Sequence, residues 1–123
     1  MKIYESAENY LETILILSQE KEHVRSVDIA NQLQYSKPSV SIAMKNLRND
    51  GYIEVSPEGY IMLLPKGLQV AETIYERHTL LTDYFIDLGV DPKIAAEDAC
   101  RIEHVISAES FNAIKKHALD NKN

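Results

Sequence analysis

The residues SVDIANQLQYSKPSVSIAMKNLRN, numbers 26–49, predict two short helices that are joined by a tight connection. The first helix opens with Ser26, a residue type that favours the N-cap position, and carries Asp28 in its first turn. The second opens with Ser36 and has a proline in its first turn, where a missing amide hydrogen costs no helical hydrogen bond. Because residues 5–20 predict a longer helix before this pair, the pattern is typical of a helix-turn-helix.

The second short helix has the surface chemistry that a helix in the major groove of DNA requires. No acidic residue lies between Asp28 and Asp50, so no carboxylate of this helix would face the phosphates. Ile42 can contact a thymine methyl group but cannot read a hydrogen-bonding base edge. The predicted DNA contacts are Ser36, Lys37, Pro38, Ser39, Ser41, Ile42, Lys45 and Arg48. A generic helical bundle that binds no DNA would show the same helical pattern.

The segment after this pair predicts a β-hairpin. Two β-prone runs, 52–55 and 60–64, flank the turn sequence Ser56-Pro-Glu-Gly59. A hairpin directly after the second short helix is a wing, so residues 1–64 are predicted to form a winged helix-turn-helix DNA-binding domain. Pro65-Lys-Gly67 contains proline and glycine, which interrupt regular secondary structure, and we place the domain boundary there.

Residues 65–123 predict an all-helical second domain. A long helix runs to about Leu88, another carries Cys100, and a last one runs from about Ala108 to Leu119. The predicted fold class is therefore mainly α with a small β-wing, in which a winged helix-turn-helix lobe is followed by a helical lobe.

Composition limits the class of protein. The chain has 123 residues, of which 45% are hydrophobic and 26% charged, as in a globular protein of one domain or two small lobes. No apolar run approaches the roughly 20 residues of a membrane span, and the first 20 residues do not resemble a signal peptide. The single cysteine cannot form an internal disulfide. We therefore expect a cytoplasmic protein without a membrane partner. The formal net charge of −6 argues against nucleic acid for the whole chain, but not for its acid-free segment.

The stretch Asp98-Ala-Cys-Arg-Ile-Glu-His-Val-Ile-Ser107 contains a candidate metal site. Read as one helix, it places Cys100, Glu103 and His104 at i, i+3 and i+4, on one face. A thiolate, a carboxylate and an imidazole together suit a transition metal. The other face, which can pack inward, holds Ile102, Val105 and Ile106. The alternative is a buried cysteine that packs as a small hydrophobic residue beside an ordinary Glu–His pair.

The long helix of the second domain has a broad apolar face. Such a surface usually marks an interface. Two recognition helices about 34 Å apart can contact successive turns of DNA, and a two-fold symmetric dimer supplies two such helices. We expect a homodimer on a palindromic operator, with an interface that includes Leu80, Leu81, Tyr84 and Phe85.

Four stretches resemble the diphtheria-toxin-repressor and manganese-transport-regulator family of metal-dependent repressors. They are Glu8-Asn-Tyr-Leu-Glu12, Ser36-Lys-Pro-Ser-Val-Ser41, Glu76-Arg-His-Thr-Leu-Leu81 and Asp98–Ser107. The likeness covers essentially the whole chain, and the last stretch is the most specific. It implies a winged-helix homodimer that binds operator DNA when a divalent metal is bound, in a short form without the SH3-like domain.

The resemblance also implies a ligand set. In the iron-responsive branch, the family's Cys, Glu and His ligands match Cys100, Glu103 and His104, whereas the manganese branch has a glutamate in place of this cysteine. Glu12 and His78 match positions that the manganese branch uses.

Four positions depart from the family pattern. In the second short helix, Ile42 replaces a polar residue of the iron branch. The first-helix ligand is a methionine in the iron branch and an aspartate in the manganese branch, and here it is Asn9, which offers a neutral oxygen. Thr82 and Ala96 replace the acid and the histidine of the iron branch's accessory site.

The implied cofactor is a divalent transition metal, with Fe²⁺ slightly favoured over Mn²⁺, for which Zn²⁺, Co²⁺ or Ni²⁺ can substitute in vitro.

The predicted function is a metal-sensing repressor that controls metal homeostasis genes, with no enzymatic activity and no small-molecule substrate. Metal ligands from both lobes would couple metal binding to the arrangement of the recognition helices. One alternative is a winged-helix transcription factor whose metal site no longer functions, which the asparagine at position 9 favours. A small metalloenzyme is a remote alternative, because the sequence shows no second group of catalytic residues.

Overall fold

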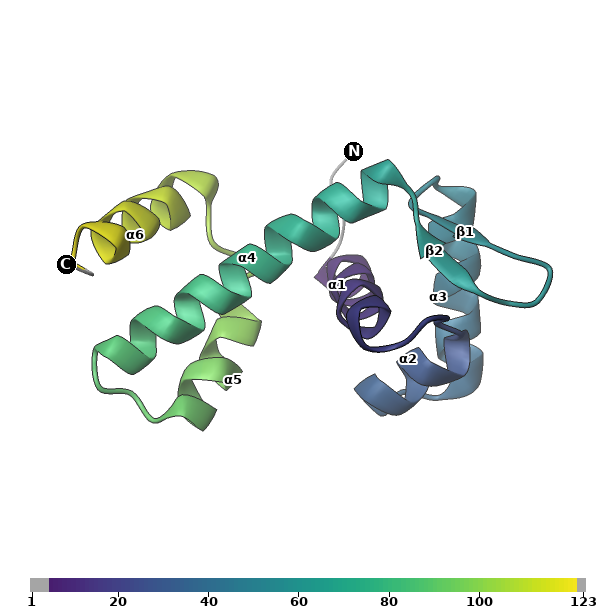
Figure 1. The fold of residues 1–123 in the computed structure, drawn as a ribbon, viewed down its shortest axis with the longest axis horizontal. Coiled ribbons are helices and arrows are strands. Elements are labelled where there is room, and N and C mark those ends of the chain that lie inside the picture. Colours follow the sequence, from purple (N-terminus) through teal and green to yellow (C-terminus); the bar gives the residue numbers. More distant parts are fainter. Residues whose placement is uncertain (1–4, 122–123) are drawn as a thin grey trace. The chain divides into compact units, whose positions relative to one another are not determined.

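The computed structural model describes residues 5–121, and packing divides the chain into two compact units, Met1–Thr73 and Ile74–Asn123. The described part is mainly helical with one two-stranded sheet (Figure 1), which confirms the predicted fold class. The unit boundary falls inside helix α4, Pro65–Asp87, which begins in the first unit and continues into the second. The predicted domain boundary at residues 64 and 65 stays a prediction. Residues 1–4 and 122–123 of the predicted domains lie outside the described residues.

The first unit contains the helix-turn-helix and the hairpin. Its elements before α4 are α1 (Glu5–Glu20), α2 (Ser26–Leu33), α3 (Lys37–Asn49), β1 (Ile53–Val55) and β2 (Ile61–Leu63). Helices α1, α2 and α3 each contribute fully buried aliphatic side chains to one core, namely Leu11, Ile14, Ile29 and Val40. The apolar spacing of the sequence therefore marks the buried faces of these helices.

The two short helices are capped in different ways. The N-cap of α2 is Arg25, which corrects the expected cap at Ser26. The Asp28 carboxylate accepts a hydrogen bond from the Arg25 backbone N–H at 2.9 Å and thereby satisfies a donor at the helix start. In α3, the expected cap is confirmed, because the Ser36 hydroxyl accepts a hydrogen bond from the Ser39 backbone N–H at 3.3 Å.

The hairpin forms directly after α3, as predicted. Strands β1 and β2 are antiparallel, with Glu54 opposite Met62. The backbone N–H of Ile61 also donates to the carbonyl of Val24 at 2.7 Å, which attaches the hairpin to the segment before α2. Gly51, at φ +83°, allows the sharp turn between α3 and β1. The wing is therefore a fixed part of the first unit.

Helix α4 begins at Pro65, within the segment that the sequence marks as a break. Proline is favoured at a first helical position because its missing N–H has no helical partner there. A Cβ atom at Gly67 would lie 2.1 Å from the carbonyl oxygen of Tyr52. Only glycine therefore allows the start of α4 to pack this closely against the backbone that leads into β1.

The second unit consists of the rest of α4, α5 (Pro92–Ile102) and α6 (Ala108–Asp120). Leu81, Ala99 and Phe111 are its most buried apolar residues in contact. Leu81 is fully buried inside this single-chain core, which corrects its predicted place in a dimer interface. Leu80 and Phe85 pack partly against the same core. Residues of α5 and α6 therefore cover part of the apolar face of α4, while Tyr84 is half-buried.

The predicted helix over residues 98–107 is wrong in its second half. Helix α5 ends at Ile102, and the N–H groups of Val105 and Ile106 both donate to the Ile102 carbonyl at 3.0 Å. Ser107 then caps α6 by accepting a hydrogen bond from Ser110 at 3.1 Å. Val105, expected to pack inward, has 73% of its surface exposed because it lies on this turn.

Within the described residues, we find no helix with the length and apolar character of a membrane span.

Candidate functional site

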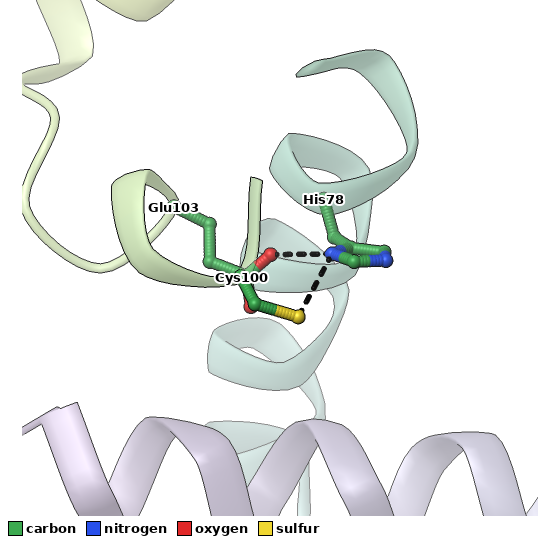
Figure 2. Close-up of side chains that lie close together, drawn as sticks. All are labelled: His78, Cys100 and Glu103. Carbon is green, nitrogen blue, oxygen red and sulfur yellow. Dashed lines mark hydrogen bonds and ion pairs between the residues drawn. The ribbon is translucent and has the colours of Figure 1, made fainter. Parts of the chain in front are cut away.

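Three predicted ligands meet in the second unit (Figure 2). His78 comes from α4, Cys100 from the last turn of α5, and Glu103 from the turn that follows α5. His78 Nδ1 lies 2.9 Å from Glu103 Oε2 and 3.7 Å from Cys100 Sγ. One ligand atom from each residue lies within 4.8 Å of the others. The helix end thus brings together side chains that the sequence separates by more than 20 positions.

The three side chains differ in their exposure. The Glu103 side chain is only 1% exposed, the His78 side chain is 27% exposed, and Cys100 is exposed. A buried carboxylate is costly unless it is paired or coordinated, and Glu103 has the imidazole as one such partner. The group therefore has a buried acidic side and an accessible thiol side.

His104 contacts the same carboxylate from another direction. Its Nε2 lies 3.3 Å from Glu103 Oε1, and its side chain is 4% exposed. Glu103 therefore lies between two imidazoles. The structure brings His104 next to Glu103, as expected, but His104 is not part of the group of three around Cys100.

The donor atoms suit a divalent transition metal. The ligand atoms lie within 4.8 Å of one another. Two atoms that bind the same metal are separated by at most about twice the metal–ligand bond length, which is about 2.0–2.3 Å for nitrogen, oxygen and sulfur on zinc. Imidazole nitrogen and carboxylate oxygen are accepted by most first-row metals, while thiolate favours the softer ones. His78, Cys100 and Glu103 thus fit a metal as a partial ligand set that needs further donors.

The remaining predicted ligands lie in the first unit, on α1. Asn9 and Glu12 are three residues apart and share one face of this helix. Glu12 is 6% exposed, and the Asn9 backbone carbonyl accepts a hydrogen bond from the Thr13 hydroxyl at 2.8 Å. Their role as ligands stays a prediction.

The predicted DNA contacts lie on the surface of the first unit. The eight residues from Ser36 to Arg48 that were assigned to DNA are all exposed, and Ile42 is 63% exposed. Lys45 and Arg48 line a hollow of about 220 Å³ together with Ser26, Ser41, Met44 and Val55. No acidic side chain lines this hollow. A basic, acid-free surface next to the wing is what a phosphate backbone would contact.

One residue beside the candidate metal ligands had no predicted role. The Arg77 Nη1 atom donates hydrogen bonds to the backbone carbonyls of Glu103 at 3.1 Å and Ile106 at 3.0 Å. No local pattern in the sequence indicates these contacts, because they join residues 26 and 29 positions apart.

Family models match both units. Residues 2–60 match the N-terminal DNA-binding domain of iron-dependent repressors, and residues 64–120 match their metal-binding and dimerisation domain. The transcriptional regulator MntR of Salmonella typhimurium is 36% identical over 109 residues, which are 89% of this chain and 69% of the relative. An uncharacterised HTH-type transcriptional regulator of Methanocaldococcus jannaschii is 31% identical over 113 residues, which are 90% of each chain.

A solved structure has the same fold over nearly the whole chain. The manganese regulator SloR superimposes with a TM-score of 0.82 at 25% identity, covering 99% of this chain and 56% of SloR. This chain therefore spans about half the length of that protein. The two family matches and the curated relatives agree with the motifs around residues 8, 36, 76 and 98. The chain belongs to the diphtheria-toxin-repressor and manganese-transport-regulator family, the iron-dependent repressors, which are metal-dependent DNA-binding transcriptional regulators.

Proposed function

We propose that this protein is a repressor that binds a palindromic operator as a homodimer when a divalent metal is bound by His78, Cys100 and Glu103. The observation that carries the proposal is the meeting of these three donors in the domain that matches metal binding and dimerisation. A bound metal would supply positive charge beside the buried carboxylate. The chain's residues hold that carboxylate in place, through His78 on one oxygen and His104 on the other.

Fe²⁺ is our slightly favoured metal over Mn²⁺. The thiol of Cys100 supports iron, because thiolate suits a softer ion than manganese. The names of two relatives support manganese, since SloR is a manganese regulator and another solved structure at 23% identity is a manganese-dependent repressor with manganese. We further propose that the protein is cytoplasmic and regulates metal homeostasis genes. We propose no enzymatic activity and no small-molecule substrate for it, because relatives of the chain are named as transcriptional regulators.

A second candidate is a winged-helix regulator whose metal site no longer functions. The specific observation in its favour is Asn9, which stands where the family has a methionine or an aspartate ligand.

A metal titration that is followed by DNA binding separates the two candidates. An operator is first selected in vitro from random duplexes with the Mn²⁺-loaded protein and then labelled for fluorescence anisotropy. Fe²⁺, under anaerobic conditions, and Mn²⁺ are titrated in parallel. We expect operator affinity to rise with either metal, and the rise to be lost in His104→Ala but kept in His117→Ala, a histidine on α6 outside the cluster. Operator binding that ignores both metals would favour the second candidate.

A further inference from the structure

Arg77 and His78, which are neighbours on α4, contact Glu103 in two different ways. The guanidinium of Arg77 holds the Glu103 backbone carbonyl at 3.1 Å, while the imidazole of His78 contacts the Glu103 carboxylate at 2.9 Å. Consecutive residues of one helix thus contact both the backbone and the side chain of a single candidate ligand.

The backbone contact falls where α5 ends. The last carbonyl groups of a helix have no helical partner, and Glu103 is the C-cap residue of α5. Arg77 Nη1 reaches the carbonyls of both Glu103 and Ile106, the first and fourth residues of the turn. Hydrogen bonds from an ionised donor are stronger than neutral ones, and a cation is favoured at a helix C-terminus. The turn from 103 to 106 is therefore tied to α4 at both ends.

The same guanidinium also lies beside an aromatic ring of α6. Its central carbon lies 5.6 Å from the centre of the Phe111 ring on α6, and its Nε is buried without a hydrogen-bond partner among the described residues. Enclosure by a ring and by a packed environment limits the conformations that this long side chain can adopt. Arg77 is thus a rigid tether, unlike a mobile surface cation.

We infer that Arg77 is a positioning residue for the metal centre, which holds the Glu103–His104 turn in the conformation that presents the carboxylate to His78 and Cys100. The inference rests on the proposed metal-dependent function. Without the tether, the turn would have more conformations to lose on metal binding, so affinity would fall although every ligand remains. Partners that orient metal ligands typically contribute about 10- to 100-fold in affinity.

The test compares Arg77→Met with Lys115→Met in the full chain. Lys115 is a matched control, because it is another cation that links α6 to α4, through Glu76 at 3.2 Å, without touching Glu103. Mn²⁺ affinity is measured by competition with a metal-binding dye, and Co²⁺ is used as a spectroscopic probe of the ligands. We expect Arg77→Met to weaken Mn²⁺ binding about 10- to 100-fold and to change the d–d and thiolate charge-transfer bands of bound Co²⁺. Lys115→Met should match the parent in both.

Arg77→Lys keeps the charge on a shorter side chain without the second arm of the guanidinium. We expect it to fall between the parent and Arg77→Met in affinity and in the Co²⁺ spectrum, and it decides the question if Arg77→Met does not fold. Parent-like affinity and spectrum in Arg77→Met, or in Arg77→Lys where Arg77→Met does not fold, would overturn the inference, and so would an equal loss in the Lys115→Met control. A parent protein that binds neither ion would instead reject the proposed metal centre, and the inference with it.

Discussion

At the scale of single residues, we predict that Cys100 sets the preference of the site between Fe²⁺ and Mn²⁺. It is the only soft donor of the cluster, and its Sγ lies 3.7 Å from His78 Nδ1. The position is exposed in the last turn of α5, where glutamate is a good helix former. A carboxylate here would make the site harder, and Mn²⁺ accepts carboxylates better than thiolate.

We therefore predict that Cys100→Glu shifts metal preference towards Mn²⁺. The Mn²⁺ concentration for half-maximal operator binding should fall relative to that for Fe²⁺, measured anaerobically, by about tenfold, or about 1.4 kcal/mol. Cys100→Ser, which offers a weak donor of similar size, serves as the control and should weaken both metals. If the ratio stays unchanged in Cys100→Glu while metal still binds, Cys100 is not a ligand.

At the scale of the helix, α3 carries two cations on one side. Lys45 and Arg48 are exposed and line the same hollow beside the wing. Because they would contact phosphates, replacing either one with Ala should weaken binding to all DNA sequences. The slope of log affinity against log salt should decrease by about one unit for each. Lys93→Ala, which removes an exposed cation from α5, should leave the slope as it is. If both α3 variants have the same salt slope as the parent, α3 does not contact DNA phosphates.

The start of α2 predicts a pH dependence of stability. The hydrogen bond from Lys21, at 2.7 Å, and that from the Arg25 backbone lower the pKa of Asp28 below its ordinary value. A carboxyl group with a lowered folded-state pKa stabilises the fold above its unfolded pKa, about 3.9, and this contribution disappears as the pH falls through the folded pKa.

Asp28→Ala should therefore be less stable than the parent by about 0.5–1.5 kcal/mol at pH 7, the usual net contribution of a hydrogen bond, and the difference should narrow below about pH 4. Urea unfolding at a series of pH values measures it. Glu22→Ala, at a side chain that is 88% exposed, is the control and should change stability little at any pH. A difference that stays constant down to pH 2.5 would contradict the role of the Asp28 charge.

At the scale of the whole molecule, residues 2–60 match a DNA-binding domain and residues 64–120 match a metal-binding and dimerisation domain. Two recognition helices in one dimer bind two half-sites at once, which raises affinity through effective concentration. Tyr84 remains a candidate interface residue, because it is partly exposed and lines an apolar groove between α4 and α6 with Leu80 and Leu119.

We predict that Tyr84→Glu shifts the protein from dimer towards monomer in sedimentation and weakens operator binding by at least about tenfold, since one half-site contact is lost. Gln69→Glu adds the same charge to an exposed position of α4 in the first unit, and it should sediment as the parent does. A dimer that persists unchanged in Tyr84→Glu would place the interface elsewhere.

The sequence by itself determined the family and the elements of the first unit. Apolar spacing located the helices of the first unit, Ser36 marked the start of α3, and the turn at 56–59 marked the wing. The donor types of Cys100 and Glu103 indicated a metal. These properties are local, because periodicity, caps and turns depend on residues a few positions apart.

The tertiary structure alone decided how the site is built. It ended α5 at Ile102, which placed Glu103 at the C-cap and His104 in the turn that follows. It also brought His78 to the cluster, buried Leu81 inside one chain and tied Arg77 to the turn after α5. The contacts of Arg77 and His78 with Glu103 join residues that lie more than 20 positions apart along the chain. No local pattern encodes such contacts, because they follow from the way in which whole apolar faces pack together.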